Sequence, residues 1–417
     1  MPRRFYYGYL ILFLCFLNTL FARGAFGSFS VFYVALLEDF HWSHAVGASI
    51  VSLNSLVYAS VSPGVGFLFD RLGPRVLMPL AGLLMGLGFI LSGFSDSLWQ
   101  LYFYYGIVAA VGQGGLGFVT QSALLSAWFV RRRATAIGLA TAGQGFGLIT
   151  LVPLAQLWID RSGWRSALMF VGALILLGVI PLNALFQRRT PALVGQLPDG
   201  EASAADAVVR AATSSREWTL GAALHSTPFW TIAAGHFALG TALFIVYTHF
   251  VAHLVDQSFD KLTAAFLFGA LGFMRVVGTF MWGYASDRLG RARTYGFSIG
   301  VAAVGILCII GIGPGAPAWL AYAAAVLYGV GHSAGNPTYG AVISDIFAGK
   351  NIGTIFGFLE ITFGIGMALG SWSGGAIFDL TGSYRWAFAA SLACFVLSFA
   401  AIQASTTWQK RTRAAAG

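Results

Sequence analysis

Long apolar runs separated by short charged turns fill almost the whole chain. Twelve of these runs are long enough, at roughly 20 residues each, to cross a bilayer as α-helices. They are predicted at about 6–36, 45–69, 76–95, 100–129, 134–158, 166–187, 228–254, 261–285, 294–313, 318–346, 352–377 and 384–405. The first run is too long for the apolar part of a cleavable signal peptide, and no small-residue cleavage site follows it. The pattern therefore predicts an all-α membrane protein with twelve transmembrane helices.

One long polar stretch divides the twelve runs into six and six. It covers residues 189–226 and is rich in Ala, Ser, Pro and Gly, which is typical of a linker. The predicted organisation is a six-helix bundle over 1–188, a cytoplasmic linker over 189–226, a second six-helix bundle over 227–405 and a cytoplasmic tail over 406–417.

A charged turn occurs once in each half, as GFLFDRLGPR at 66–75 and GYASDRLGRAR at 283–293. Five residues, Gly66, Asp70, Arg71, Leu72 and Gly73, recur 217 positions later as Gly283, Asp287, Arg288, Leu289 and Gly290. A second set recurs at an offset of 219, with Gly138, Gly145, Gly147, Asp160 and Gly163 matching Gly357, Gly364, Gly366, Asp379 and Gly382. Such an internal repeat predicts two pseudo-symmetric bundles with the same orientation in the membrane.

Composition and charge agree with a bilayer protein. Hydrophobic residues make up 57% of the chain and charged residues only 9%, against roughly 25% charged residues in a soluble domain. With the N-terminus inside, only Arg161, Arg165, Lys261 and Arg385 of the 24 Lys and Arg lie in outer loops. Two lie within spans and the other 18 lie on the cytoplasmic side, which predicts cytoplasmic N- and C-termini. This distribution explains the net charge of +9 without a nucleic-acid partner.

The three cysteines lie inside apolar runs. Cys15, Cys308 and Cys394 have neither paired nor metal-ligand spacing. No carboxylate stands at ligand spacing from the histidines either. We therefore expect no metal and no cofactor.

The two D-R-x-G turns, each after the second helix of a six-helix half, resemble those of the major facilitator superfamily over essentially the whole chain. WFVRRRATAIGLATAGQGFG at 128–147 is similar to the fifth-helix signature of the monocarboxylate porters and of the oxalate/formate antiporter-like bacterial transporters. VFYVALLEDFHWSHA at 31–45, REWTLGAALHSTPFW at 216–230 and IFDLTGSYRWAF at 377–388 support the same resemblance. The resemblance implies a substrate site near the bilayer midplane between two bundles that rock against each other.

The repeated turns are predicted to act as gates at the cytoplasmic side. Asp70 can pair with Arg71 or Arg75, or face the positive N-terminal end of the eleventh helix. In the second half, Asp287, Arg288 and Arg291 are expected to make the corresponding contacts with the start of the fifth helix. An alternative is that these residues only set the topology, and the two roles are compatible.

Charged residues inside spans are costly and therefore indicate function. Arg23 lies in the first helix, Arg275 in the eighth and Glu360 in the eleventh. Two cations against one anion favour an anionic substrate, because a guanidinium can bind a carboxylate through two hydrogen bonds. The alternatives are that Arg275 or Arg23 pairs with Glu360, or that Arg23 extends to the interface.

The resemblance also implies a substrate-binding arginine in the eighth helix, four residues before the glycine of the D-R-x-G turn. That position holds Thr279, and Arg275 lies one helical turn earlier on the same face, roughly 6 Å away. Because of this departure, the resemblance implies a carboxylic acid as the class of substrate but does not identify a particular acid.

Proton coupling needs a group that titrates in the membrane. His249 is a candidate for substrate binding or proton transfer, and related bacterial transporters often have a histidine there. Glu360 is the second candidate, since a carboxylate in a low-dielectric environment can bind a proton near neutral pH. His236, His253 and His332 also lie in spans, and the first two can be simple interface residues.

Polar residues on cavity-type helices complete the predicted substrate site. They are Tyr58, Gln121, Asn336 and Tyr339, with Gln113 and Gln144 as further members. Tyr58 is the repeat mate of Arg275 at the offset of 217. Helix-to-helix hydrogen bonding is the alternative explanation for each of them.

The sequence thus predicts a secondary transporter that moves a small organic anion, such as a monocarboxylate, together with protons, as a monomer in the lipid bilayer. The alternatives are an anion/anion exchanger of dicarboxylate type and a multidrug or metabolite proton antiporter. An enzyme is not expected, because no GxSxG, HExxH or Walker pattern occurs. A channel would not need two gate turns, and a transporter-like sensor would need a signalling module.

Overall fold

The computed structural model describes residues 6–198, 218–347 and 351–414. The side chains of residues 134, 287, 336, 410 and 412–414 also lie outside the described part. The described chain is helical and carries no strand in these ranges. It divides into two compact units, residues 1–29 with 60–208 and residues 30–59 with 209–417.

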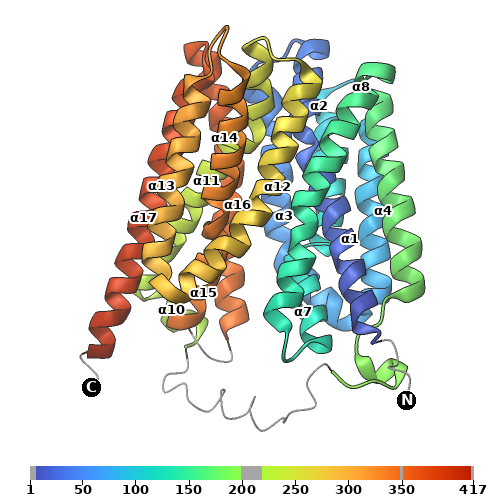
Figure 1. The fold of residues 1–417 in the computed structure, drawn as a ribbon. Helices are drawn as coiled ribbons and strands as arrows, with labels where there is room; N and C mark the ends of the chain where they lie inside the picture. Colours follow the sequence, from blue (N-terminus) through green and yellow to red (C-terminus); the bar gives the residue numbers. More distant parts are fainter. Residues whose placement is uncertain (1–5, 199–217, 348–350, 415–417) are drawn as a thin grey trace. The chain divides into compact units, whose positions relative to one another are not determined.

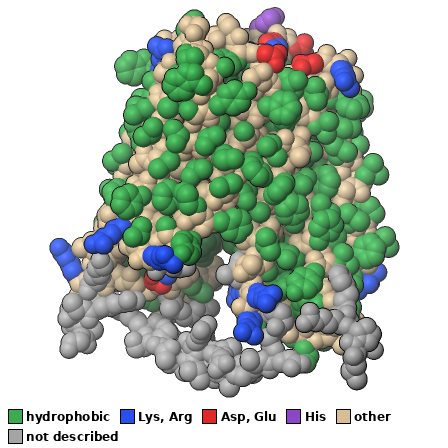
Figure 2. All heavy atoms as spheres, viewed as in Figure 1, with side chains coloured by type: hydrophobic (Ala, Val, Ile, Leu, Met, Phe, Trp, Pro, Cys, Tyr) green, Lys and Arg blue, Asp and Glu red, His purple; other side chains and the backbone are tan. Residues whose placement is uncertain are grey.

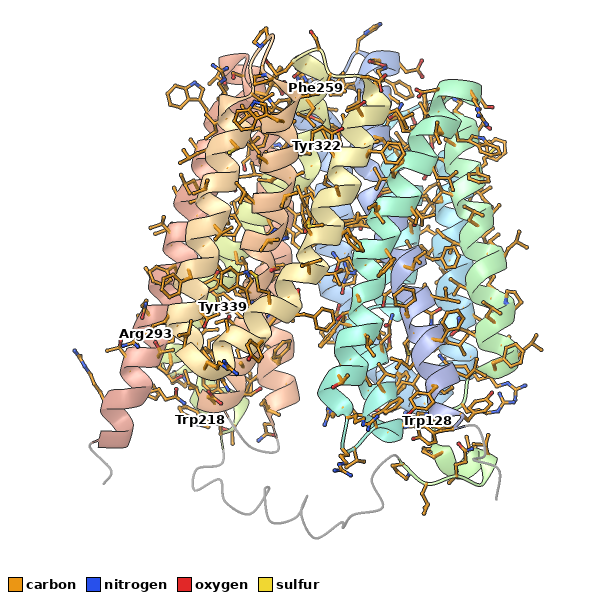
Figure 3. All side chains as sticks on the ribbon, viewed as in Figure 1. Trp128, Trp218, Phe259, Arg293, Tyr322 and Tyr339 are labelled. Carbon is orange, nitrogen blue, oxygen red and sulfur yellow. The ribbon has the colours of Figure 1, made fainter. Side chains whose placement is uncertain are left out.

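The first unit is a helical bundle (Figure 1). Its helices are α1 (Gly8–Gly27), α4 (Pro74–Ser92), α5 (Leu98–Leu101), the π-helix η1 (Tyr102–Ala109), α6 (Ala110–Gly115), α7 (Phe118–Trp128), α8 (Arg133–Phe186) and the 3-10 helix η2 (Pro191–Val194). α1 and α4 both pack on α8. Trp128 at the end of α7 is fully buried and donates from Nε1 to the carbonyl of Arg188 at 3.1 Å (Figure 3).

The second unit contains α2 and most of the C-terminal half. Its helices are α2 (Phe29–Phe40), α10 (Leu220–Leu224), α11 (Thr227–Asp256), α12 (Lys261–Leu289), α13 (Arg291–Gly311), α14 (Ala318–Gly331), the 3-10 helix η3 (His332–Ala334), α15 (Gly335–Ile346), α16 (Ile352–Thr381) and α17 (Tyr384–Ala414). The long helix α3 (His44–Leu72) begins in the second unit and ends in the first. α11 packs on both α16 and α17, so it lies at the centre of this unit.

The predicted spans agree with these helices to within a few residues. Within the described ranges, ten helical segments are long and apolar enough to cross a membrane. One of them, Thr135–Phe186, is divided by Gly163, whose φ of 78° and ψ of 163° are not helical. The interrupted segment 318–346 adds the remaining span. The described part of the chain is therefore the expected all-α membrane protein with twelve spans, although α17 continues through most of the predicted tail.

Apolar side chains on the outside of the helices are consistent with lipid contact. Figure 2 shows hydrophobic side chains over the face in view, with the charged side chains gathered towards the helix ends. Leu177, Trp386 and Leu397 are 72%, 66% and 61% exposed, respectively. Exposed apolar area of this extent on a water-soluble monomer would be an aggregation surface, whereas in a bilayer it faces acyl chains.

The internal repeat reappears in how each unit packs. In the first unit, a Cβ built on Gly147 of α8 would lie 2.3 Å from the carbonyl oxygen of Leu20 in α1. In the second unit, a Cβ on Gly366 of α16 would lie 2.2 Å from the carbonyl oxygen of Phe237 in α11. Leu20 and Phe237 are 217 positions apart, so the same close helix contact is built twice. Small residues allow such contacts, which supply the van der Waals packing that holds helices together in lipid.

Replacing Gly147 by Ala should therefore destabilise the protein even though alanine favours helices. The added methyl group must push α1 from α8, at a cost of about 1–3 kcal/mol. The thermal unfolding temperature of the purified protein should fall by several degrees. Gly300→Ala is the matched control, because a Cβ at Gly300 of α13 meets no atom within 4 Å, and equal melting of the two variants would contradict this explanation.

Candidate functional site

Two spans are interrupted at corresponding positions of the two halves. The fourth span breaks between α6 and α7, where Leu116 (ψ 7°) and Gly117 (ψ −176°) leave the helical conformation. The tenth span breaks between α14 and α15 at η3. The repeat offset of 217 places Leu116 in register with Ser333 of η3. In transporter folds built from repeats, matching helix breaks indicate the part of each half that lines the substrate pathway.

Polar side chains satisfy the backbone at the break in the tenth span. Trp282 of α12 donates from Nε1 to the carbonyl of Val330 at 2.9 Å. Ser298 of α13 donates to the carbonyl of Gly331. Unpaired carbonyl groups inside a membrane cost several kcal/mol each. These two hydrogen bonds therefore allow the helix to be interrupted here without leaving those carbonyl groups unpaired.

Arg275 of α12 lies about one helical turn before Gly278, which packs against Val330 and Ser333 at this break. It is close enough to interact electrostatically with Tyr247 of α11, Tyr328 of α14 and His332 of η3. Tyr247 donates or accepts a 2.7 Å hydrogen bond with Nε2 of His332. The guanidinium is only half-buried. Tyr247 is also accessible, whereas every other residue from Ala238 to Leu254 on α11 is buried.

No carboxylate of the described residues forms an ion pair with Arg275. The predicted alternative, a structural pair with Glu360, is thus not among the described contacts of Arg275. A guanidinium carries five donors and no acceptor. Arg275 also lies within electrostatic range of the Tyr247 hydroxyl, and both are donor groups of the kind that a carboxylate binds.

Thr279 stands at the position where the resemblance implies a substrate-binding arginine, but its side chain does not replace that arginine. Its hydroxyl donates to the carbonyl of Arg275 at 2.9 Å, one turn back along α12. This hydrogen bond turns the side chain towards its own helix backbone. Arg275 therefore provides the positive charge of this part of α12.

His249 lies on a different face of α11 from Tyr247. Its Nε2 hydrogen-bonds the carbonyl of Ser371 in α16 at 2.8 Å, and its ring stacks on Tyr384 at 5.0 Å. Tyr33 of α2 contacts the same ring edge-on at 5.4 Å. The ring is fully buried, and its Nδ1 has no hydrogen-bond partner in the described part of the chain. The structure thus does not bring His249 to Arg275, although both were predicted to bind substrate.

A second polar cluster ties α3 to α16 at the end of the helices near the α16–α17 turn. The Asp379 carboxylate accepts from the backbone N–H groups of His44 at 2.8 Å and Ala45 at 2.9 Å, and it lies 3.2 Å from Nδ1 of His44. These amides are the unsatisfied donors of the first turn of α3. Tyr33 adds a hydrogen bond to the His44 carbonyl at 3.0 Å. Asp379 is therefore an N-cap supplied by a different helix, a role that the sequence analysis did not assign.

The candidates of the first unit are Arg23 and Gln121. Arg23 is half-buried in α1. Gln121 of α7 is 5% exposed; it accepts from the Thr19 hydroxyl at 2.8 Å and donates to the carbonyl of Leu116 at 2.6 Å. Both ends of its amide are thus engaged, and it stabilises the break in the fourth span.

The remaining substrate candidates have varied surroundings. Tyr339 of α15 is 1% exposed, and its hydroxyl hydrogen-bonds Ser398 of α17 while its ring stacks on His236 (Figure 3). Tyr58 of α3 and Glu360 of α16 are half-buried. The side chain of Asn336 lies outside the described residues.

The first repeated turn has a partner that the sequence analysis missed. Asp70 pairs with Arg189, which follows α8, at 3.1 Å. It was expected to pair with Arg71 or Arg75. Instead, the Arg71 guanidinium lies 4.4 Å from the ring centroid of Phe67, and Arg75 donates to the carbonyl of Ala184 at 2.9 Å. The Asp70–Arg189 pair is largely exposed, so it contributes at most about 1 kcal/mol.

In the second repeated turn, Arg291 forms an ion pair with Asp345 of α15. The Arg288 guanidinium lies 4.4 Å from the ring centroid of Tyr284. The side chain of Asp287 lies outside the described residues. Each turn is thus tied to its own unit by an arginine–aspartate pair, and the predicted contacts with the fifth and eleventh helices stay predictions.

The described residues hold no group of three or more His, Cys, Asp or Glu side chains that could bind a metal ion. The potential ligands of the two polar clusters are used in hydrogen bonds to backbone groups and hydroxyls instead. Neither cluster pairs a nucleophile with a base in the manner of a hydrolase. These features define a multi-pass helical membrane protein, built from two related halves, with a cationic residue on a continuous span that packs against one of its interrupted spans.

Comparisons with known proteins agree with this class. The sequence profile of the Major Facilitator Superfamily matches residues 15–280 and 257–416. The chain belongs to the major facilitator superfamily. It is 28% identical to monocarboxylate transporter 13 of Bos taurus over 382 residues, covering 92% of this chain and 85% of the relative. It is 30% identical to monocarboxylate transporter 11 of Homo sapiens, covering 85% of this chain and 73% of the relative.

The fold is also found in a solved structure. A bacterial homologue of the human lysosomal transporter Spinster, crystallised in an inward-facing and occupied conformation, superposes with a TM-score of 0.71 at 16% identity. The superposition covers 96% of this chain and 97% of that one. The relatives are transporters, and the prediction that the chain is not an enzyme is confirmed.

Proposed function

We propose that the protein is a secondary active transporter that moves a small organic anion, in the first instance a monocarboxylate, by alternating access with proton symport. The observation that carries the proposal is Arg275, a half-buried guanidinium in a span with no carboxylate partner among the described residues. A charge in such a place is costly unless a ligand compensates it. The names of the relatives, which are monocarboxylate transporters, support the same substrate class.

Within this proposal, Arg275 binds the carboxylate through two parallel hydrogen bonds. Arg23, Tyr58 and Asn336 keep their predicted roles as further substrate contacts. Glu360 and His249 stay the two candidates that the sequence offers for carrying the proton. Gln121 and Tyr339 are weaker candidates for direct contact, because their polar atoms are already hydrogen-bonded within their own units.

The proposed setting is a bacterial inner membrane with both termini in the cytoplasm and the protein as a monomer. The basic residues support this orientation, since 18 of the 24 lie in the segments that it places inside. The repeated turns with Asp70, Arg71 and Arg75 and with Asp287, Arg288 and Arg291 then act at the cytoplasmic gate.

Anion exchange is the second candidate function. The presence of another intramembrane arginine, Arg23, favours it, because a dicarboxylate can use two cations. A multidrug or metabolite proton antiporter has less support, since an intramembrane guanidinium disfavours lipophilic cations.

Uptake into proteoliposomes tests the proposal. Purified protein is reconstituted and given labelled acetate, L-lactate, pyruvate, butyrate, oxalate or succinate, with and without an inward proton gradient. Uptake of monocarboxylates that rises with the gradient supports symport. Uptake only against an internal anion supports exchange. Absence of uptake of every acid in both formats would reject the anion proposal.

A further inference from the structure

A buried histidine, His332, hydrogen-bonds Tyr247, and both residues lie within electrostatic range of Arg275. His332 is 2% exposed and is held on both sides. Its Nδ1 lies 2.6 Å from the carbonyl of Tyr328, and its Nε2 lies 2.7 Å from the hydroxyl of Tyr247. The ring also stacks on Tyr328 at 4.7 Å. This geometry fixes the imidazole in one orientation.

The two partners also fix which nitrogen carries the hydrogen. The Tyr328 carbonyl can only accept a hydrogen bond, so Nδ1 of His332 must donate. In the neutral ring, Nε2 then has a bare lone pair and accepts from the Tyr247 hydroxyl. The hydroxyl proton therefore points at His332 while the histidine is neutral, and it is not available to a ligand at Arg275.

Adding a proton to Nε2 reverses this hydrogen bond. Nε2–H then donates to the Tyr247 oxygen, and the hydroxyl hydrogen must turn to another acceptor. Arg275 cannot accept it, because a guanidinium has no acceptor. A carboxylate bound at Arg275 can accept it. No covalent bond between heavy atoms changes. When Nε2 releases its proton to water, the Tyr247 hydroxyl turns back and donates to Nε2 again.

The surroundings of His332 make this proton depend on the ligand. The titratable or charged groups that act on it, within the described chain, are Arg275 of α12, the hydrogen-bonded Tyr247 hydroxyl of α11 and Tyr328 of α14, whose ring stacks on the imidazole. α13 presents the Ser298 hydroxyl to the neighbouring carbonyl of Gly331. No carboxylate is among these groups. The acceptor that the turned Tyr247 hydroxyl needs therefore has to come from a ligand.

We propose that His332 binds the coupled proton and that Tyr247 transmits its protonation state to the carboxylate at Arg275. This inference rests on the proposed function and specifies its coupling mechanism. Anion and proton each increase the affinity for the other, as linkage requires. Arg275 and the Tyr247 hydroxyl together bind the carboxylate only when His332 is protonated. This assigns proton coupling to the break in the tenth span, rather than to Glu360 or His249.

The pH dependence of acid affinity tests the proposal. The Kd of the panel acid that the wild-type protein binds most tightly is measured between pH 6 and pH 8 by thermal stabilisation. Every acid of the panel except succinate is almost fully ionised in this range, so for these acids a pH effect must come from the protein. With one coupled proton, Kd should rise about tenfold per pH unit. In His332→Gln and in Tyr247→Phe the Kd should be nearly independent of pH.

His236→Gln is the matched control. His236 is also buried in the second unit and hydrogen-bonded to a backbone carbonyl, that of Leu359 at 3.2 Å, but it does not contact Tyr247. This variant should keep the wild-type dependence on pH. In proteoliposomes, His332→Gln should lose proton-driven accumulation of the acid and keep acid counterflow without a gradient.

The possible failures are distinguishable. If the wild type binds no acid, the proposed function itself fails. If it binds acids but without pH dependence, or if Tyr247→Phe keeps the tenfold change, the assignment to His332 is overturned while the anion site stands. Tyr247→Phe removes one hydroxyl only, so it decides the question even if His332→Gln does not fold.

Discussion

Arg275→Ala should abolish the binding and uptake of the acid substrate. The substitution removes two charge-assisted hydrogen bonds, each contributing about 1.5–3 kcal/mol in a partly desolvated site. Affinity should therefore fall by a factor of about 100 or more. Because no described carboxylate pairs with Arg275, its removal leaves no partner charge unpaired in that part of the chain. The protein should thus keep or gain thermal stability while it loses stabilisation by the acid.

Arg275→Lys sharpens this test. Lysine keeps the positive charge but cannot form the two parallel hydrogen bonds of a guanidinium. We expect measurable binding that is about tenfold or more weaker than in the wild type. Arg293→Ala is the matched control, since Arg293 is an exposed arginine in the first turn of α13 (Figure 3). If Arg275→Ala still binds and transports the acid normally, the carboxylate does not sit at Arg275.

The helices were predictable because the bilayer sets their length and the turns carry strong signals. Gly73 and Gly290, in the repeated turns, have φ of 72° and 82°, a conformation that favours glycine. The breaks in the fourth and tenth spans were not predicted. Leu116 and Gly117 are apolar or small, and at His332–Ala334 the two polar residues His332 and Ser333 are too few to end a long apolar run. Hydropathy therefore predicts one continuous span across each break.

The charged residues of the candidate site were predictable from the sequence, but their contacts with residues far away in the sequence were not. Arg275 was found because an arginine inside a span is rare. Its neighbours Tyr247 and His332 are 85 positions apart in the sequence, and only the packing of α11 on the interrupted span brings them together. The same holds for Asp70 and Arg189, which are 119 positions apart. The repeat match of Asp379 with Asp160 was the one signal that could have drawn attention to Asp379.

Asp379→Ala should weaken the attachment of α3 to α16. The wild-type carboxylate caps the first turn of α3 through the N–H groups of His44 and Ala45. Loss of such a cap costs about 0.5–2 kcal/mol, and here the cap joins two helices. Any state in which these helix ends separate should therefore become about 2- to 30-fold more populated.

Labelling of a cysteine placed behind this contact measures the change. Ser52 of α3 is 8% exposed and donates to the carbonyl of Ala368 in α16 at 2.8 Å. In a Cys308→Ser, Cys394→Ser background, Ser52→Cys should react slowly with a maleimide in detergent. Adding Asp379→Ala should accelerate the reaction by the same 2- to 30-fold.

The control for this experiment is a helix cap that does not connect two helices. Asp260 accepts from the N–H of Thr263 within its own helix, α12, at 3.0 Å. Asp260→Ala removes a comparable cap without releasing α3 from α16, so it should leave the labelling rate of Ser52→Cys unchanged. If both variants accelerate the labelling of Ser52→Cys equally, the cause is a general loss of stability. If Asp379→Ala does not accelerate the labelling, α3 stays packed on α16 without the cap. An acceleration specific to Asp379→Ala, suppressed when the acid is bound, would link this contact to the transport cycle, because a ligand changes a conformational equilibrium only if it binds the two states differently.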